Sequence, residues 1–412
     1  MYSHILVALD GSEPSRCAGR AVLVLASATG ARVTACHVYG AQMHRRRFID
    51  MEGGLPAEYQ EQTRLHDLRA AHDQLIDEGF RALSTGYVED FLVEAKAAGV
   101  PVSSATAEGR SYTGILRLAE RDGVDLIALG AHGLGAVGDG LLGGTTTRVL
   151  ANAPCDVLVS RCPPGEGAIL AGVDGSDEAL QAAATAVAIG RATDRPVRMT
   201  AAYDPDFHTQ IFLTMGRSLS PERQEEVGLA NQEKLHDDII NDGLGKLYAE
   251  FLSEAERRFG GNGVPVRTSL TTGKPYCALN AQAAEIGADL IVLGRYGHHR
   301  EPCSYLGSNA EGLLRTSSAN VLLVGGVRRR DDASDSAAAT DHAEHPTSTA
   351  GHTLRWDTDA EARLRRVPSF ARSMAKRAVE NAVRETGGDR VSLADFNDVA
   401  ARFGMGKPGG GR

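Results

Sequence analysis

The feature that most constrains this chain is a glycine pattern that occurs twice with the same spacing. In each copy an apolar run ends at one glycine, a second follows after two residues, and a third follows after nine more. These glycines are Gly130, Gly133 and Gly143 in the first copy, and Gly294, Gly297 and Gly307 in the second. Such a repeat at identical spacing is far less probable by chance than one glycine motif. The pattern therefore indicates a tandem duplication with a phosphate-cradling loop in each copy.

Apolar runs and helical stretches alternate in the same order in both copies. Continuous apolar runs suit strands buried in a parallel sheet, and a three- to four-residue periodicity indicates helices between them. The predicted strands are 5–9, 32–39, 101–107, 125–130 and 157–159, then 168–173, 197–203, 264–271, 290–294 and 321–324. The predicted helices are 15–29, 56–98 (interrupted at Gly79 and Gly86) and 115–121, then 178–192, 221–259 and 278–285. This order predicts two parallel-sheet α/β/α domains.

The loops at the carboxyl ends of parallel strands gather on one edge of the sheet, where such folds bind ligands. An Asp-Gly-Ser turn follows the first strand in each copy, beginning at Asp10 and Asp174, and lies on the same edge as the glycine loops. Glycine lets the backbone approach a ligand closely, so that several N–H groups can point at phosphate oxygens. Two alternatives stay open: the glycines only make tight turns, and each aspartate caps the following helix instead of contacting a ribose or adenine.

Other nucleotide-binding motifs do not fit. Neither copy has the lysine of a P-loop, and neither has the glycine fingerprint of a dinucleotide-binding fold in its first turn. No Ser-His-Asp, metal-ligand or paired-carboxylate pattern stands out, so we expect no enzyme, or at most weak ATP hydrolysis. Arg295 and Arg300 are the candidates for charge beside a phosphate in the second copy.

Composition excludes some classes of function. The 412 residues carry a net charge of -9, which argues against general nucleic-acid binding. The basic runs 45–47 and 328–330 are expected to be solvated loop charge. Six cysteines form no Cys-x-x-Cys pair, which favours reduced, packed thiols over a metal site. We find no signal peptide and no apolar run long enough for a membrane helix, so a cytoplasmic protein is expected.

The Asp-Gly-Ser turns, the Asp-Leu-Ile runs and the G-x2-G-x9-G spacing together resemble a tandem universal stress protein of the ATP-binding type, over about residues 1–327. The resemblance implies two domains at 1–162 and 166–327 with an adenine nucleotide alpha hydrolase-like fold, and ATP as ligand, with Mg2+ as an optional companion. It also implies that strands 157–159 and 321–324 pair across a pseudo-twofold, giving an intramolecular pseudo-dimer and leaving higher homo-oligomers open. The implied nucleotide-binding residues are Ala8, Asp10, Val38, Gly130, His132, Gly133, Gly143, Gly144, Thr145 and Thr146, then Asp174, Gly294, Gly297, Gly307, Ser308 and Asn309.

Both copies depart from that family pattern. The first has Gly144 where a hydroxyl residue is expected, although Thr145 and Thr146 follow directly. The second has Tyr296 where the family often has histidine, and we align its Tyr203 with Val38. A tyrosine at that position would either crowd an adenine ring or stack on it, so we expect unequal occupancy of the two sites.

The chain changes character after the second copy. Residues 328–352 are rich in Ala, Ser, Thr and Asp without periodicity, which predicts a flexible linker. Residues 353–405 return to helical periodicity and resemble the C-terminal module of the light-independent protochlorophyllide reductase B subunit. An apolar stripe runs through Val367, Phe370, Met374, Ala378, Val379 and Ala382. We interpret this small all-α module as a docking site for a protein partner.

The sequence thus predicts an adenine-nucleotide-binding regulatory or stress-response protein. Two other hypotheses stay open: an adaptor whose loops bind no nucleotide, and an accessory protein for redox or tetrapyrrole enzymes.

Overall fold

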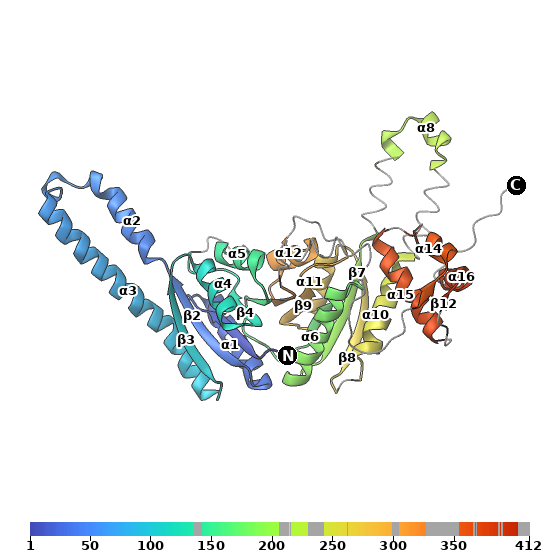
Figure 1. Ribbon diagram of the computed structural model, residues 1–412, viewed down its shortest axis with the longest axis horizontal. Coiled ribbons are helices and arrows are strands. Elements are labelled where there is room, and N and C mark those ends of the chain that lie inside the picture. The colour runs from blue at the N-terminus through green and yellow to red at the C-terminus, as the bar shows by residue number, and fades with distance from the viewer. Residues whose placement is uncertain are drawn as a thin grey trace. The chain divides into compact units, whose positions relative to one another are not determined.

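The computed structural model (Figure 1) describes residues 1–135, 142–205, 214, 216–229, 243–261, 263–298, 305–326, 354–365, 367, 369–385, 388 and 390–402. Its main feature is a ten-stranded sheet with the strand order β3-β2-β1-β4-β5-β10-β9-β6-β7-β8. The first five strands are β1 His4–Ala8, β2 Arg32–Tyr39, β3 Val102–Glu108, β4 Leu126–Gly130 and β5 Asp156–Ser160. The other five are β6 Ile169–Gly172, β7 Val197–Tyr203, β8 Val266–Thr272, β9 Leu290–Gly294 and β10 Asn320–Val324. The two halves of the order mirror each other.

The pairings that the described residues show within each copy are parallel. Strands β1, β4, β5 and β10 are almost entirely buried, as continuous apolar runs require. The connecting helices are α1 Glu13–Thr29, α2 Ala41–Met51, α3 Gln62–Ala97, α4 Ser111–Asp122 and α5 Gly144–Asn152 in the first copy. In the second they are α6 Asp177–Thr193, α8 Pro221–Glu226, α10 Gly245–Phe259, α11 Pro275–Glu285 and α12 Ser308–Thr316. The predicted tandem α/β fold is confirmed.

Capping residues determine where the first helix of each copy begins and ends. Ser12 caps α1, Pro14 fits the first turn, and Gly30 ends the helix with φ 73°. The backbone N–H of Gly30 donates to the carbonyl of Ala26. In α6 the cap is Ser176, and Asp194 takes the left-handed position with φ 52°. Local sequence therefore sets both ends of these helices.

The two copies join through their last strands. β10 pairs antiparallel with β5, with Val321 opposite Val159 and Leu323 opposite Val157. Equivalent residues make matching bonds across this junction: the N–H of Gly325 donates to Asp156 Oδ1 at 2.8 Å, and the N–H of Arg161 donates to Asn320 Oδ1 at 2.9 Å. The predicted pairing of the two final strands is confirmed.

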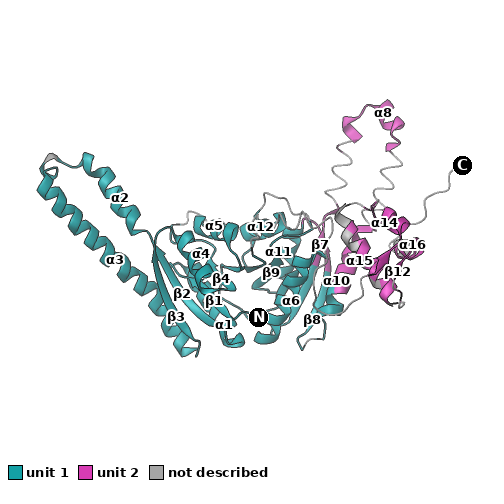
Figure 2. Cartoon of the chain, in the orientation of Figure 1, with its two compact units in different colours: residues 1–200, 255–269, 275–327 teal, residues 201–254, 270–274, 328–412 magenta. Residues whose placement is uncertain are grey.

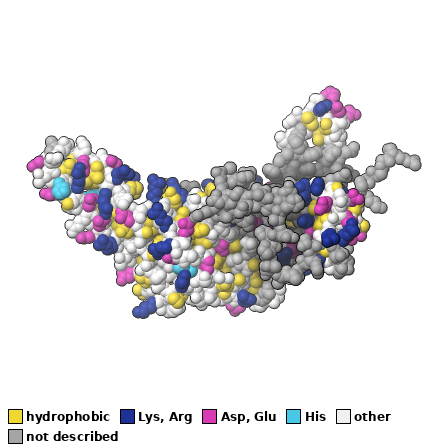
Figure 3. Space-filling model, viewed as in Figure 1, with side chains coloured by type: hydrophobic (Ala, Val, Ile, Leu, Met, Phe, Trp, Pro, Cys, Tyr) yellow, Lys and Arg dark blue, Asp and Glu magenta, His cyan; other side chains and the backbone are white. Residues whose placement is uncertain are grey.

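Two expectations about helices α2 and α3 of the first copy are corrected by the structure. Helix α3 runs unbroken from 62 to 97, although interruptions at Gly79 and Gly86 were predicted. Each mid-helix glycine costs about 1 kcal/mol, but Val88, Phe91 and Ala95 are buried on the same helix and hold it in place. The basic run 45–47 lies on helix α2 rather than in a loop, and Arg45 forms an ion pair with Asp77 on α3. On the face shown in Figure 3, acidic and basic side chains are interspersed over this region.

The chain divides into two compact units, residues 1–200, 255–269 and 275–327, and residues 201–254, 270–274 and 328–412 (Figure 2). Within the second unit, α14 Thr358–Arg365, α15 Ser369–Glu385 and α16 Leu393–Arg402 surround a core of their own. Its buried side chains are Leu354, Ala360, Leu364, Val367, Val379, Val383, Val391, Phe396 and Val399. Two short strands, β11 Arg355–Trp356 and β12 Arg390–Val391, pair in parallel, so the module is helical with a small strand pair rather than all-α.

Parts of the C-terminal prediction fall outside what the structure describes. Residues 328–353 and the side chains of Phe370 and Met374 are not described. Val367 and Val379 of the predicted stripe do lie in the core. None of the described helices is both long enough and apolar enough to cross a bilayer.

Candidate nucleotide site

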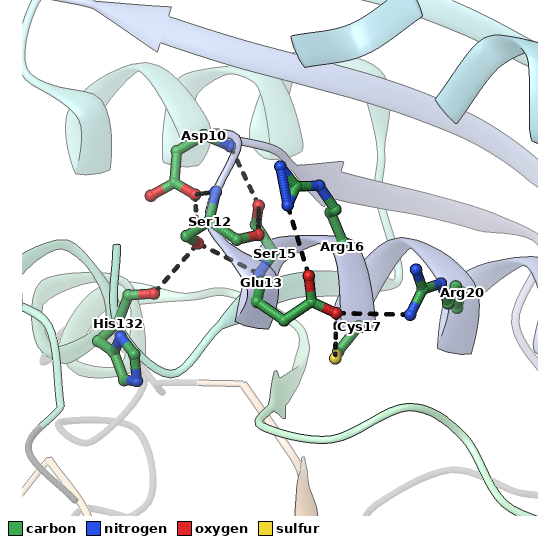
Figure 4. A network of polar contacts seen from close by, with 8 residues as sticks. All are labelled: Asp10, Ser12, Glu13, Ser15, Arg16, Cys17, Arg20 and His132. Carbon is green, nitrogen blue, oxygen red and sulfur yellow. Dashed lines mark hydrogen bonds and ion pairs between the residues drawn. The ribbon is translucent and has the colours of Figure 1, made fainter. Parts of the chain in front are cut away.

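The first part of the site is the Asp-Gly-Ser turn after β1 (Figure 4). Gly11 has φ 77°, a conformation that glycine adopts without strain. Asp10 Oδ1 accepts hydrogen bonds from the N–H of Ser12 at 3.0 Å and from its hydroxyl at 2.5 Å. The hydroxyl of Ser12 in turn accepts from the N–H of Ser15 at 3.3 Å. Ser12 is therefore the helix cap, and Asp10 holds the cap rather than capping the helix itself.

The second copy repeats this arrangement. Asp174 Oδ1 accepts from the N–H of Ser176 at 2.9 Å and from its hydroxyl at 2.6 Å. The sequence predicted a role for the two aspartates but none for the two serines. Their signal was available, because serine is among the preferred residues at a helix N-cap. In both copies one carboxylate oxygen is thus committed to the turn.

The other carboxylate oxygen lies against the glycine loop. A Cβ placed on Gly133 would lie 2.4 Å from Asp10 Oδ2, and one placed on Gly297 would lie 2.4 Å from Asp174 Oδ2. A side chain at either position would therefore displace the carboxylate. The structure therefore brings the end of the first strand and the second glycine of the motif into contact in both copies, as their shared edge predicted.

The first glycine of the motif has a different role. A Cβ on Gly130 would meet the backbone of the first turn of α1, 2.7 Å from the nitrogen of Ser15. A Cβ on Gly294 would meet the backbone carbon of Glu178 on α6 at 2.8 Å. These two glycines allow a strand end to pack tightly on a helix start. For them, the interpretation as structural glycines accounts for the geometry.

The third glycine places a helix N-terminus beside the loop. The N–H of Gly143 donates to the carbonyl of Ala131 at 2.8 Å, and the N–H of Gly307 donates to that of Arg295 at 2.9 Å. Gly143 and Gly307 are the N-cap residues of α5 and α12, and neither helix has a side-chain cap. Serines cap α1 and α6, whereas the first-turn amides of α5 and α12 have no side-chain acceptor among the residues that the structure describes.

The residues that follow the third glycine are not equivalent. Gly144 is exposed and Thr145 half-buried, whereas Thr146 is buried and its hydroxyl donates to the carbonyl of Gly130 at 2.8 Å. Thr146 thus ties the helix to the strand end, and its hydroxyl is already used. In the second copy Ser308 and Asn309 are exposed at the start of α12.

His132 contributes its backbone to the site more clearly than its ring. Its carbonyl lies 3.3 Å from the hydroxyl of Ser12, while the imidazole points away from Asp10 (Figure 4). Nδ1 of that ring is buried without a hydrogen-bond partner among the described residues. Tyr296, at the corresponding position, is buried.

The strand register corrects the alignment of Val38. The backbone N–H of Leu9 donates to the carbonyl of Cys36 at 2.8 Å, and that of Val173 donates to the carbonyl of Thr200 at 2.9 Å. Because Leu9 and Val173 are equivalent in the repeat, Cys36 and Thr200 are equivalent too. Counting two residues on, the counterpart of Val38 is Ala202. The predicted match with Tyr203 is wrong by one residue, and the argument that a tyrosine crowds an adenine there falls with it.

The remaining predicted positions lie at the same edge. Ala8 ends β1 opposite Cys36, and β2 continues beyond that pair through Val38. Val38 is buried, and a Cβ on Gly114 would lie 2.6 Å from it, so this glycine makes room for the valine. Ala8 and Val38 therefore border the site at the strand ends.

Arg295 does not serve a phosphate of its own copy. Its side chain is fully buried and donates to the carbonyls of Gly325 and Leu150, both at 2.5 Å. Burial lowers the pKa of this guanidinium. Arg300 lies outside the described residues.

The donor set fits a phosphate group better than a metal ion. Backbone amides and an uncapped helix N-terminus are anion-binding groups. Among the described residues no group of three or more His, Cys, Asp or Glu side chains could hold a metal. A Mg2+ ion accompanying a nucleotide would therefore be held mainly by the phosphates and water. Loop residues 136–141 and 299–304 lie outside the described chain.

Comparison with known proteins agrees with this geometry. The model of the universal stress protein family matches residues 1–161 and again 167–325. The chain belongs to the universal stress protein family. A universal stress protein of Thermus aquaticus, named for the QAH/OAS sulfhydrylase 3′ region, is 32% identical over 163 residues, covering 39% of this chain and 100% of the relative.

Solved structures share the fold over both copies. A universal stress protein from Archaeoglobus fulgidus covers 78% of this chain and 98% of its own, with 16% identity and a TM-score of 0.51.

Two others are described with ligands: one in complex with cAMP (23% identity, 39% and 98% covered, TM-score 0.27), and one from Arabidopsis thaliana with AMP bound (16%, 38% and 90%, TM-score 0.25). Outside the tandem copies, residues 356–399 match the family model of the proto-chlorophyllide reductase 57 kD subunit.

Proposed function

We propose that this universal stress protein binds an adenine nucleotide at the carboxyl edge of each copy. The observation that carries the proposal is the repeated contact between the aspartate and the second glycine, beside an uncapped helix. Asp10 Oδ2 touches Gly133 in the first copy, and Asp174 Oδ2 touches Gly297 in the second. The carboxylate would accept hydrogen bonds from the nucleoside, and the amides at the start of α5 and α12 would hold the phosphates.

The phosphate end of the site supports this assignment by contrast within the chain. The serine caps of α1 and α6 occupy first-turn amides with a side-chain oxygen. Gly143 and Gly307 have no side chain with which to do so. An anion is the group that a helix N-terminus binds in place of a capping oxygen. ATP is the ligand we favour, and AMP and cAMP are the alternatives with fewer phosphate charges.

Calorimetric titration of the nucleotide-free full chain with ATP in the presence of Mg2+ tests the proposal. Two binding sites per chain are expected, and Gly133→Ala should remove one of them. Gly79→Ala is the control, because Gly79 lies within helix α3 and a Cβ there meets nothing within 4 Å. Absence of any heat at millimolar ATP, AMP and cAMP would refute nucleotide binding.

We further propose that the protein is a cytoplasmic regulatory or stress-response factor rather than an efficient enzyme. The carboxylates beside the glycine loops, those of Asp10 and Asp174, are assigned here to the nucleoside, and the candidate Arg295 is bound elsewhere. Turnover of ATP by the full chain should therefore stay far below the 1–100 s⁻¹ that is typical of kinases. A rate in that range would contradict the regulatory assignment.

A second proposal concerns residues 353–405, as a module that docks a protein partner. Its separate core favours this role, as does its match to the family model of the proto-chlorophyllide reductase 57 kD subunit. The exposed charges on α15 supply a surface for testing: Arg372 and Lys376 are exposed on successive turns. Reversing both to glutamate in the full chain should abolish capture of a partner that the wild type retains, without changing nucleotide binding.

A further inference from the structure

Arg295 makes an unusual set of contacts. It directly follows β9 in the second copy, yet it donates to the carbonyl of Leu150 at 2.5 Å and lies 3.4 Å from that of Cys155, both in the first copy. Leu150 belongs to the last turn of α5. The last carbonyls of a helix have no partner within it and carry the negative end of its dipole. Arg295 therefore caps the C-terminus of a helix in the opposite copy.

A second arginine makes the reciprocal contact. Arg161 directly follows β5 in the first copy, and its guanidinium donates to the carbonyl of Leu314 at 2.5 Å. Leu314 occupies the last turn of α12 in the second copy. The last turn of α5 contains no basic residue. Each of these helices is thus held at its C-terminus by an arginine from the other copy.

The two arginines stand at non-equivalent positions. By the spacing of the repeat, the counterpart of Arg295 is Ala131 and that of Arg161 is Gly325. The same contact has therefore been built twice from different places in the fold. Duplication of the sequence alone would have given the same residue in both copies, so the reciprocity does not simply follow from the repeat.

The opposite ends of the same helices are the proposed phosphate sites. Gly143 begins α5 and Gly307 begins α12. At 1.5 Å per residue, a capped carbonyl in the last turn lies about 10 Å from the first-turn amides. Over that distance a buried unit charge at an effective dielectric of about 20 changes anion affinity on the order of tenfold before salt screening.

We propose that Arg161 and Arg295 are positioning residues for the nucleotide site of the opposite copy. Arg295 holds α5 in place and adds a positive charge at its C-terminus, while the N-terminus of α5 contacts the first site. Arg161 does the same for α12 and the second site. This inference rests on the proposed nucleotide binding. It predicts that each site depends on a residue outside its own copy.

The test uses the full chain and ATP with one site disabled at a time. Gly297→Ala leaves the first site to be titrated alone, and Gly133→Ala leaves the second. In each background we would introduce Arg295→Met or Arg161→Met, which keep an apolar stem but remove the guanidinium. Thermal melting confirms that each variant is folded, and Arg161→Lys tests whether a charge partly restores affinity.

A crossed pattern is the expected result. Arg161→Met should weaken ATP binding at the second site roughly three- to tenfold and change the first site by less than about twofold. Arg295→Met should weaken the first site by a similar factor. A merely structural role would weaken both sites alike or neither, and either result overturns the positioning role. If the wild type binds no ATP at all, the proposed function fails first and this inference falls with it.

Discussion

Two glycines of one motif should respond in opposite ways to the same substitution. Gly130→Ala would place a Cβ 2.7 Å from the nitrogen of Ser15 and 2.9 Å from two atoms of Pro14. These are backbone and ring atoms that can move only if α1 shifts off the sheet. In Gly133→Ala the nearest neighbour is the carboxylate of Asp10, the end of a side chain that can rotate away.

The size of the two effects follows from what must move. Overpacking against a rigid backbone costs roughly 1–3 kcal/mol, so Gly130→Ala should lower the melting temperature by about 3–10 °C. Gly133→Ala should cost about 1 kcal/mol at most, because a half-exposed side chain can yield and only its hydrogen bonds to Ser12 weaken. It should nevertheless abolish ATP binding at the first site, because the displaced Asp10 is the proposed nucleoside contact.

Circular-dichroism melting and calorimetric titration on the same samples would decide this prediction. The second copy provides the replicate, since a Cβ on Gly294 meets the backbone of Glu178 at 2.8 Å and one on Gly297 meets Asp174 Oδ2 at 2.4 Å. If Gly130→Ala melts within about 1 °C of the wild type, the packing argument is wrong. If Gly133→Ala destabilises as much as Gly130→Ala, the separation of structural from functional glycines is wrong.

Three further predictions concern residues other than the motif glycines. Burial raises the pKa of Cys36 to about 12, so this thiol should react with iodoacetamide at pH 8 far more slowly than exposed Cys277; equal rates of modification by mass spectrometry would contradict its burial. Burial also raises the pKa of Asp156, so the folded state holds its proton more tightly than the unfolded state and this group's contribution to stability is lost as the pH rises from about 4 through the folded pKa. In urea titrations Asp156→Asn should therefore gain stability over the wild type as pH rises to 7, and an unchanging difference would refute that. Ser176→Ala should cost about 1 kcal/mol through loss of the α6 cap, measured by urea unfolding, and a cost below about 0.3 kcal/mol would show that the cap is dispensable.

Much of the fold was predictable because its signals are local. Apolar runs such as 5–9 and 290–294 identify buried strands wherever they lie, and Ser12 and Gly30 mark the ends of a helix from their own conformational preferences. The repeat then predicted that both copies share one topology, and the family resemblance implied that β5 and β10 meet. The break expected in α3 failed because glycine propensity is weak, and buried side chains such as Phe91 outweigh it.

The candidate site was predicted at the level of segments and less well at the level of atoms. Asp10 and Gly133 were chosen from sequence and do meet in the structure. From the sequence Val38 aligns with Tyr203, and only the hydrogen-bond register shows that its counterpart is Ala202. Thr146 looked like a phosphate ligand until its buried hydroxyl was seen to bind the carbonyl of Gly130.

The sequence by itself determined that this protein is a duplicated α/β chain whose loops converge on one edge, because periodicity and glycine spacing are properties of contiguous residues. Only the tertiary structure decided which glycine makes room for a helix and which one makes room for a carboxylate. It also decided which carbonyls the side chain of Arg295 contacts. Its acceptor at Leu150 is a backbone carbonyl 145 residues away in sequence. Every residue carries such a carbonyl, so no side-chain pattern could identify this one before β5 and β10 brought the two copies together.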